Sequence, residues 1–191
     1  TQRARLIYVA KHKNIKSINY EDFINDEFKG KVCIRSGFHP YNISLFASLM
    51  ENHNKAWLKD FLIKLKSNLA RKPQGNDRDQ VKAIAAGVCD VAYANNYYYF
   101  KMLDNEDQKK WLEKAEPIFP NQNKQGTHIN ISGITLINEK TKKQSLHFLN
   151  FLISEDAQRI YASDNYEFPA NPAVKPAENV ATLLGDSKFE T

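Results

Sequence analysis

The chain has 191 residues, of which 42% are hydrophobic, 12% aromatic and 26% charged, with a formal net charge of +5. This is globular composition for one large or two small domains, and it excludes a low-complexity chain. No run of 18 apolar residues is present, which excludes a membrane-spanning helix. The lysines are dispersed among acidic residues, which favours a solvated surface over a nucleic-acid interface.

The first segment, RARLIYV (3–9), is expected to be a buried strand. A natural protein rarely begins inside a strand, so we expect a piece of a longer protein, and the lack of a signal peptide says nothing about export. A short helix is expected around NYEDFIND (19–26). KVCIRSG (31–37) is expected to form a second strand that stops at a Ser-Gly turn.

Alternating strands and helices follow. Apolar residues recur every three and four positions in YNISLFASLMENH (41–53), which predicts a helix, and Asn54 can cap the next one. Asn76 can cap DRDQVKAIAA (77–86), and VCDVAYA (88–94) is the next expected strand. This order predicts an α/β fold, with a parallel or mixed sheet flanked by helices.

The remaining segments predict one more strand and several helices. DNEDQKKWLEKA (104–115) is typical of a capped amphipathic helix, and INISGITLI (129–137) of an apolar strand. KKQSLHFLNFLIS (142–154) and SEDAQRIYASD (154–164) predict two helices. A proline-punctuated tail then precedes a last helical stretch.

Two aromatic segments are expected to lie at the carboxyl ends of predicted strands. RSGFHPY (35–41) follows one predicted strand, and NNYYY (95–99) follows another. In α/β sheets ligands bind beyond the carboxyl ends of the strands. The sequence therefore predicts that the two segments converge on one site.

The run Tyr97, Tyr98 and Tyr99 has three interpretations. An isolated triple tyrosine is more often a packed aromatic cluster, and a stacking platform for bases would need interleaved arginine and lysine, which is missing. Tyr41, at the other strand end, favours the third interpretation, a site for a hard metal ion. Fe(III) prefers anionic oxygen and can displace the proton of a phenol, whose ordinary pKa is about 10.

Polar residues around these tyrosines are candidates for holding an anion beside a metal. Ser36, Gly37, Asn76 and Asn95 fall at turns or helix starts, where N–H groups suit anions, although each alone is more often a cap or turn residue. His39 and His128 are weaker candidates, since a surface or loop position explains each. The sequence contains no G-x-S-x-G, H-E-x-x-H, P-loop or C-x-x-C motif, so almost nothing supports an enzyme.

Longer blocks carry a family resemblance. RARLIYV, FKGKVCIRSG…YN, NLARKPQGNDRDQVKAIAAGVCDVAYANNYYY, FPNQNKQGTHINISGITL and NYEFPANPAVKP together resemble the periplasmic ferric-iron-binding proteins of bacterial ABC importers. The resemblance covers nearly the whole chain in order. It implies a periplasmic binding protein-like fold (type II), with two α/β lobes joined by hinge strands and one lobe incomplete here.

The resemblance also implies a function. Such a protein captures Fe(III) in the periplasm and delivers it to an inner-membrane ABC permease. It acts as a monomer, without catalysis, nucleic acid or a membrane span of its own. Two competing classes remain: a binding protein for an organic cation or oxyanion, and a basic RNA- or DNA-binding module.

Carried over residue by residue, the family's adjacent tyrosine pair falls on Tyr97 and Tyr98, and the third ligand of its tyrosine-rich branch on Tyr41. Tyr99 then packs. The synergistic anion of the other branch, such as carbonate or phosphate, would be held by residues at four positions: Ser36, Gly37, Asn76 and Asn95. Tyr41 weighs against this anion, because a third phenolate already supplies charge and occupies a coordination position.

The resemblance further implies the domain organisation. Residues 1–9 would be a hinge strand, 10–125 the C-terminal lobe with the tyrosines, 126–176 a hinge strand and part of the N-terminal lobe, and 177–191 a return to the C-terminal lobe. Export would allow a disulfide between Cys33 and Cys89, if their strands are neighbours. The alternative is two small buried hydrophobic residues.

Overall fold

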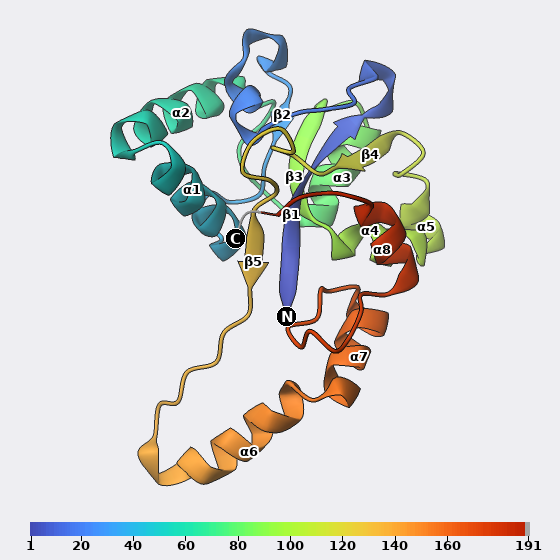
Figure 1. The fold of residues 1–191 in the computed structure, drawn as a ribbon. Coiled ribbons are helices and arrows are strands. Elements are labelled where there is room, and N and C mark those ends of the chain that lie inside the picture. Colours follow the sequence, from blue (N-terminus) through green and yellow to red (C-terminus); the bar gives the residue numbers. More distant parts are fainter. Residues whose placement is uncertain (190–191) are drawn as a thin grey trace. The chain divides into compact units, whose positions relative to one another are not determined.

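The computed structural model describes residues 1–189 and divides into two compact units (Figure 1). Unit 1 comprises residues 1–3 and 131–186, and unit 2 comprises residues 4–130 with the described residues from 187 onward. The chain was expected to return to the C-terminal lobe at residue 177, whereas unit 2 resumes at residue 187. Residues 190 and 191 of that expected segment lie outside the described residues, and the lobe assignment stays a prediction.

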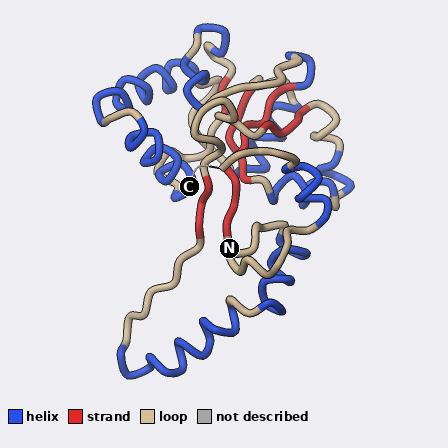
Figure 2. Tube along the Cα trace, in the orientation of Figure 1, coloured by secondary structure: helices blue, strands red, loops and turns tan. Residues whose placement is uncertain are grey.

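A mixed sheet forms the centre of unit 2 (Figure 2). Its strand order is β2-β3-β1-β4, and β5 also pairs with β1. β2 runs parallel to β3, whereas β1 runs antiparallel to both β3 and β4. This confirms the predicted α/β fold with a mixed sheet. The strands are β1 (Gln2–Ala10), β2 (Val32–Cys33), β3 (Val91–Asn95), β4 (Ala115–Ile118) and β5 (Ile129–Ile131).

Eight α-helices lie within the described residues: α1 (Pro40–Asn52), α2 (Lys55–Asn68), α3 (Asp77–Ala85), α4 (Tyr97–Leu103), α5 (Glu106–Lys109), α6 (Lys142–Leu152), α7 (Glu155–Asn165) and α8 (Glu178–Leu184). Short 3-10 turns span Lys11–Lys13, Tyr20–Ile24, Asp26–Phe28 and Glu139–Thr141. Asn54 and Asn76 cap α2 and α3, because their side chains accept hydrogen bonds from backbone N–H groups of the first turn. No helix of residues 1–189 is both long and apolar enough to cross a membrane.

The core of unit 2 packs α1 and α2 against the sheet through fully buried aromatic and aliphatic side chains. Phe23 and Tyr93 stack in parallel with ring centroids 4.2 Å apart, which fixes the 3-10 turn of residues 20–24 to the middle of β3. β3 is buried along its whole length. The segment that follows β3, with the tyrosines, therefore starts from a rigid element.

Three expected elements differ from the structure, and one strand was not expected. The strand expected over 31–37 comprises only β2, and the strand over 129–137 ends at Ile131. Residues 131–140 are all exposed, so no packing surface holds them as a strand. The helix expected over 104–115 is limited to α5 and is followed by turns. β4 was not expected, because Pro117 interrupts a four-residue strand.

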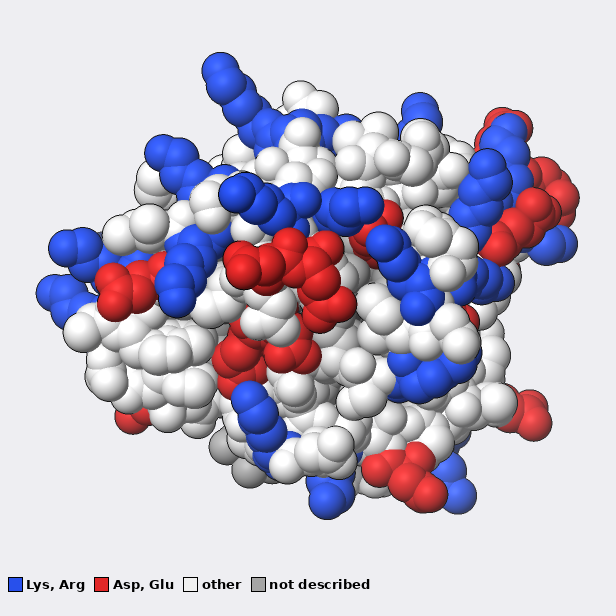
Figure 3. All heavy atoms as spheres, turned by 90° about the horizontal axis from the view of Figure 1, so that it is seen from above, with Lys and Arg blue, Asp and Glu red and all other residues white. Residues whose placement is uncertain are grey.

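The surface charge fits the dispersed pattern of the sequence. On the face shown in Figure 3, lysine and arginine side chains border aspartate and glutamate side chains in several places. Among the described residues, ion pairs join Lys13 and Lys31 to Asp90, and Lys124 to Glu21. The excess of basic residues therefore does not translate into a surface of one sign on this face.

Candidate metal centre

Two of the predicted metal ligands meet at the carboxyl ends of β2 and β3. Tyr41 is the second residue of α1, and Tyr97 is the first residue of α4, directly after β3. Their hydroxyl oxygens are 3.3 Å apart, although 56 positions separate them in the sequence. The parallel pairing of β2 with β3 produces this contact, because it brings the carboxyl ends of both strands to one edge.

Tyr98 completes a group of three phenols. Its ring centroid lies 4.2 Å from that of Tyr97. Burial raises the pKa of Tyr97 above its ordinary value, and its hydrogen bonds with the hydroxyls of Tyr41 and Tyr98 add to this effect. Tyr99 instead packs edge-on against Phe100, with centroids 5.2 Å apart. The geometry thus separates the third tyrosine of the run from the other two.

Positive groups surround the phenols. The guanidinium carbons of Arg5 and Arg35 lie 5.7 and 5.4 Å from the ring centroid of Tyr41. Arg78 lies 5.9 Å from the ring of Tyr98, and the amine of Lys101 lies 5.6 Å from the ring of Tyr97. Nearby cations favour the anionic form of an acid, so this environment suits phenolate oxygen once a metal displaces the protons.

A buried polar network lies beside the tyrosines, and sequence reasoning did not find it. Arg5 and Asp77 are both 0% exposed and form an ion pair. Arg35 donates to the other oxygen of Asp77 at 3.0 Å, and Arg5 donates to Asn42 at 2.8 Å. Asp77 was expected only as the first residue of the helix over residues 77–86. The signal that could have revealed the network is the position of Arg5 within the segment RARLIYV (3–9), which was expected to be a buried strand.

The four candidate anion-binding residues are not equivalent. Asn95 is buried, its carbonyl accepts from Arg5 at 3.0 Å, and its side-chain nitrogen has no hydrogen-bond partner within the described part of the chain. Ser36 is exposed, and its hydroxyl accepts from the backbone of Phe38 at 3.3 Å. Gly37 has open space where a side chain would be. The side chain of Asn76 caps α3 by accepting hydrogen bonds from the backbone N–H groups of Arg78 and Asp79.

The two histidines have structural partners. His39 caps α1 by accepting from the backbone N–H of Tyr41 at 3.2 Å, and its ring lies 4.5 Å from the Tyr41 ring. Burial, followed by the charge of Arg35, lowers the pKa of His39, so its ring is neutral near pH 7. His128 is buried, and its Nε2 lies 2.9 Å from the hydroxyl of Ser44.

Other metal chemistries find no cluster. Within residues 1–189, no three His, Cys, Asp or Glu side chains gather closely enough to hold a metal ion. The phenol oxygens of the three tyrosines are donors of the kind that a hard trivalent cation prefers.

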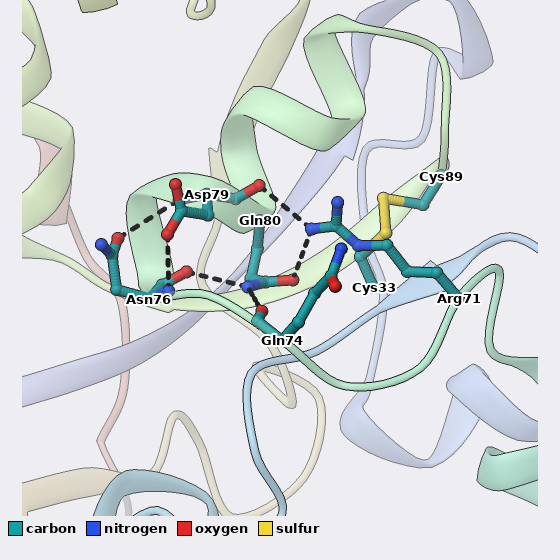
Figure 4. Close-up of a disulfide and its surroundings, with 7 residues drawn as sticks. All are labelled: Cys33, Arg71, Gln74, Asn76, Asp79, Gln80 and Cys89. Atoms are coloured by element: carbon teal, nitrogen blue, oxygen red, sulfur yellow. Dashed lines mark hydrogen bonds between the residues drawn. A yellow bond between two sulfur atoms is a disulfide. The ribbon is translucent and has the colours of Figure 1, made fainter.

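A disulfide joins the segments that lead into the site. Cys33, the last residue of β2, is bonded to Cys89, which lies just before β3, with Cα atoms 5.8 Å apart. That separation lies in the usual disulfide range of about 4.4–6.8 Å. Beside it, Gln80 donates to the carbonyls of Gln74 and Asn76, which fixes the loop before α3 (Figure 4).

Solved structures of type II periplasmic binding proteins superpose on the chain, so its α/β fold is that of this class of ligand-binding proteins. The chain belongs to the family of bacterial extracellular solute-binding proteins, and the model of that family matches residues 12–187. Residues 12–187 include all three tyrosines of the centre.

The individual relatives are proteins of iron transport by name. Iron uptake protein A1 of Synechocystis is 39% identical over the whole chain, which covers 54% of that protein. The structure of apo ferric ion-binding protein A from Pasteurella haemolytica is 45% identical with a TM-score of 0.92 and is covered to 61%. A Trichodesmium FutA structure with iron and citrate is 36% identical, with a TM-score of 0.88 and 62% coverage. The chain thus spans about half the length of its curated relatives.

Proposed function

We propose that this chain is the iron-coordinating part of a ferric-iron-binding protein, which captures Fe(III) in the periplasm and delivers it to an inner-membrane ABC permease. Tyr41, Tyr97 and Tyr98 supply the protein oxygens. The observation that carries the proposal is the 3.3 Å contact between the hydroxyls of Tyr41 and Tyr97. At this separation both oxygens are close enough to bind a single ion.

The chemistry of capture follows from charge. Each phenol loses its proton as it binds, since only the anionic oxygen is a good ligand for Fe(III). Three phenolates balance the three positive charges of the ion, so the loaded centre is neutral before any further ligand is added. The nearby guanidinium groups of Arg5 and Arg35 offset the cost of forming anionic oxygen in a partly buried position.

An external anion is compatible with the same centre. The unpartnered side-chain nitrogen of Asn95, the hydroxyl of Ser36 and the open space at Gly37 support binding of a small anion such as carbonate or phosphate beside the ion. Asn76 contributes to this role only through the helix that it caps. The relative solved with iron and citrate shows that an oxygen-rich anion accompanies iron in that protein.

The experiment is a titration of the purified, metal-free chain with ferric citrate. Tyrosinate bound to Fe(III) is expected to give an orange-red charge-transfer band that saturates at one ion per chain. Ferric citrate without protein is the control. A colourless protein, with a ligand that proves to be an organic cation, an oxyanion or a nucleic acid, would contradict the proposal.

A further inference from the structure

We infer that Arg5 is a positioning residue of the tyrosine centre, whose buried guanidinium holds the segments of Tyr41 and Tyr97 against each other. The inference rests on the proposed function only for its iron readout. The guanidinium of Arg5 donates hydrogen bonds to the side chains of Asp77, Asn95 and Asn42, so it acts on the tyrosines through these residues.

Arg5 reaches both ligand-bearing segments from β1. Its Nη2 donates to the side-chain oxygen of Asn42 at 2.8 Å, and Asn42 is the neighbour of Tyr41 in α1. Its Nη1 donates to the side-chain oxygen of Asn95 at 3.0 Å, two residues before Tyr97. One planar group therefore spans the gap between the start of α1 and the end of β3.

Asp77 binds the same guanidinium nitrogen, Nη1, that donates to Asn95. One carboxylate oxygen accepts from Arg5 and also from the backbone N–H of Asn95 at 2.9 Å. The other accepts from Arg35 at 3.0 Å. Asn42 in turn donates to the backbone carbonyls of Arg35 and Ser36, at 3.2 Å each. Every segment that carries or precedes a candidate ligand is thus tied to the same ion pair.

A neighbouring contact supports this role for β1. The backbone N–H of Asn96 donates to the carbonyl of Ala4 at 3.0 Å, and the N–H of Ala4 donates to the side chain of Asn96 at 2.9 Å. Asn96 directly precedes Tyr97. β1 therefore fixes the start of α4 through two consecutive residues, Ala4 by its backbone and Arg5 by its side chain.

The charge of this network points to positioning rather than simple stabilisation. Apolar residues of similar volume often stabilise a protein as well as a buried ion pair does, whereas removing one partner is strongly destabilising. What the ionic group adds is fixed directions, because a guanidinium offers donors in a rigid fork. Lysine keeps the charge but is a point donor, so it cannot hold Asn42, Asn95 and Asp77 in the same arrangement.

The test compares two variants. Arg5→Lys retains the positive charge and removes the fork. Asp90→Asn is the matched control, because Asp90 forms ion pairs with Lys13 and Lys31 at the other end of β3, away from the tyrosines. Both variants are measured for thermal stability, for the ring-to-ring nuclear Overhauser contact between labelled Tyr41 and Tyr97 in the metal-free protein, and for Fe(III) affinity.

We expect Arg5→Lys to weaken the Tyr41–Tyr97 contact, shift the charge-transfer band and lower Fe(III) affinity by about 10–100-fold, the usual loss for an outer-shell partner. Asp90→Asn should lower stability without these effects. If Arg5→Lys fails to fold, Asn42→Ala removes only the arm toward Tyr41 and should weaken the same contact. An unchanged contact and affinity in Arg5→Lys or Asn42→Ala, or an equal loss in Asp90→Asn, would overturn the inference.

The ring contact separates this inference from the proposed function. If the unmodified protein binds no Fe(III), the function proposal fails, while the Tyr41–Tyr97 contact in the metal-free variants still decides the role of Arg5.

Discussion

The two units of the chain differ in how far their apolar side chains are buried. In unit 2 the aromatic and aliphatic residues of the sheet, α1 and α2 are buried, and all three candidate ligands lie in that unit with the network that holds them. In unit 1, α6 has no buried residue, and side chains such as Phe148, Phe151 and Ile137 are largely exposed. The candidate centre therefore belongs to the part of the molecule that has a complete core of its own.

The comparison shows that the buried core and all three candidate ligands occur in the same unit. The apolar residues of α6 recur as they do in a helix that packs one face. The whole chain covers 54% and 61% of the lengths of two longer relatives. The predictions below test whether the difference between the units extends to metal binding, stability and pH response.

The largest expected effect separates the three candidate ligands from other tyrosines of the two units. Tyr97→Phe and Tyr98→Phe should abolish Fe(III) binding or weaken it by more than the roughly 10–100-fold of an outer-shell loss, because each removes one ligand oxygen and keeps the ring. Tyr41→Phe should weaken binding and shift the band. Tyr161→Phe in unit 1 and Tyr99→Phe should bind as the unmodified protein does. Isothermal titration with ferric citrate measures this, and equal small effects at all positions would refute the ligand assignment.

Truncation of a core side chain should show the difference in stability. Phe23→Ala removes a fully buried ring stacked on Tyr93, so we expect a loss of about 3–5 kcal/mol in the unfolding free energy of unit 2. Phe148→Ala changes a side chain that is 59% exposed and should stay within about 0.5 kcal/mol. Denaturant unfolding followed by tyrosine fluorescence gives both values. Comparable losses would show that unit 1 is as well packed as unit 2.

The disulfide should stabilise unit 2 alone. Removing it with Cys33→Ala and Cys89→Ala together should cost about 2–4 kcal/mol, because the bond closes a long loop within that unit. Amide hydrogen exchange should become faster in β2 and β3 and remain unchanged in α7. Titration of unfolded, unreduced protein for free thiols is the prior check, and two free thiols would contradict the bond itself.

The last effect is gradual and concerns pH. Burial and hydrogen bonding raise the pKa of Tyr97, so its phenol stays protonated in the metal-free protein at neutral pH. Fe(III) must displace that proton, and affinity therefore falls as pH falls, by about 1.4 kcal/mol per pH unit for each proton displaced. Titration of the charge-transfer band with citrate held constant measures the slope. A band unchanged down to about pH 4 would indicate carboxylate ligands instead.

The sequence predicted that the segments after two strands converge, and the structure brings the hydroxyls of Tyr41 and Tyr97 to 3.3 Å from each other. Whether the two strands are neighbours was left open, and their parallel pairing answers it. The assignment of the tyrosines as metal ligands stays a prediction. The α/β class and most helix starts followed from period and capping residues, as at Asn54 and Asn76.

The rest depended on pairings that a linear pattern does not contain. β4 pairs with β1 in spite of Pro117, and the strand after Thr127 stops where its residues become exposed. The Arg5–Asp77 network joins residues 72 positions apart, each of which has a plausible local role: a strand arginine and a helix-start carboxylate. Because a local role explains each residue alone, the linear pattern does not indicate that the two residues pair.

The Arg5 network also has a consequence for the order of folding. Its contacts join residues 37, 72 and 90 positions apart in the sequence, so no short segment can form the centre by itself. Contacts of such long range form only after the loops between them have closed, which is slow compared with helix formation. A nascent chain therefore carries its tyrosines as separate, weak ligands for most of its folding time. Tight loading with Fe(III) becomes a property of the finished fold, and the first appearance of the charge-transfer band during refolding would time the completion of unit 2.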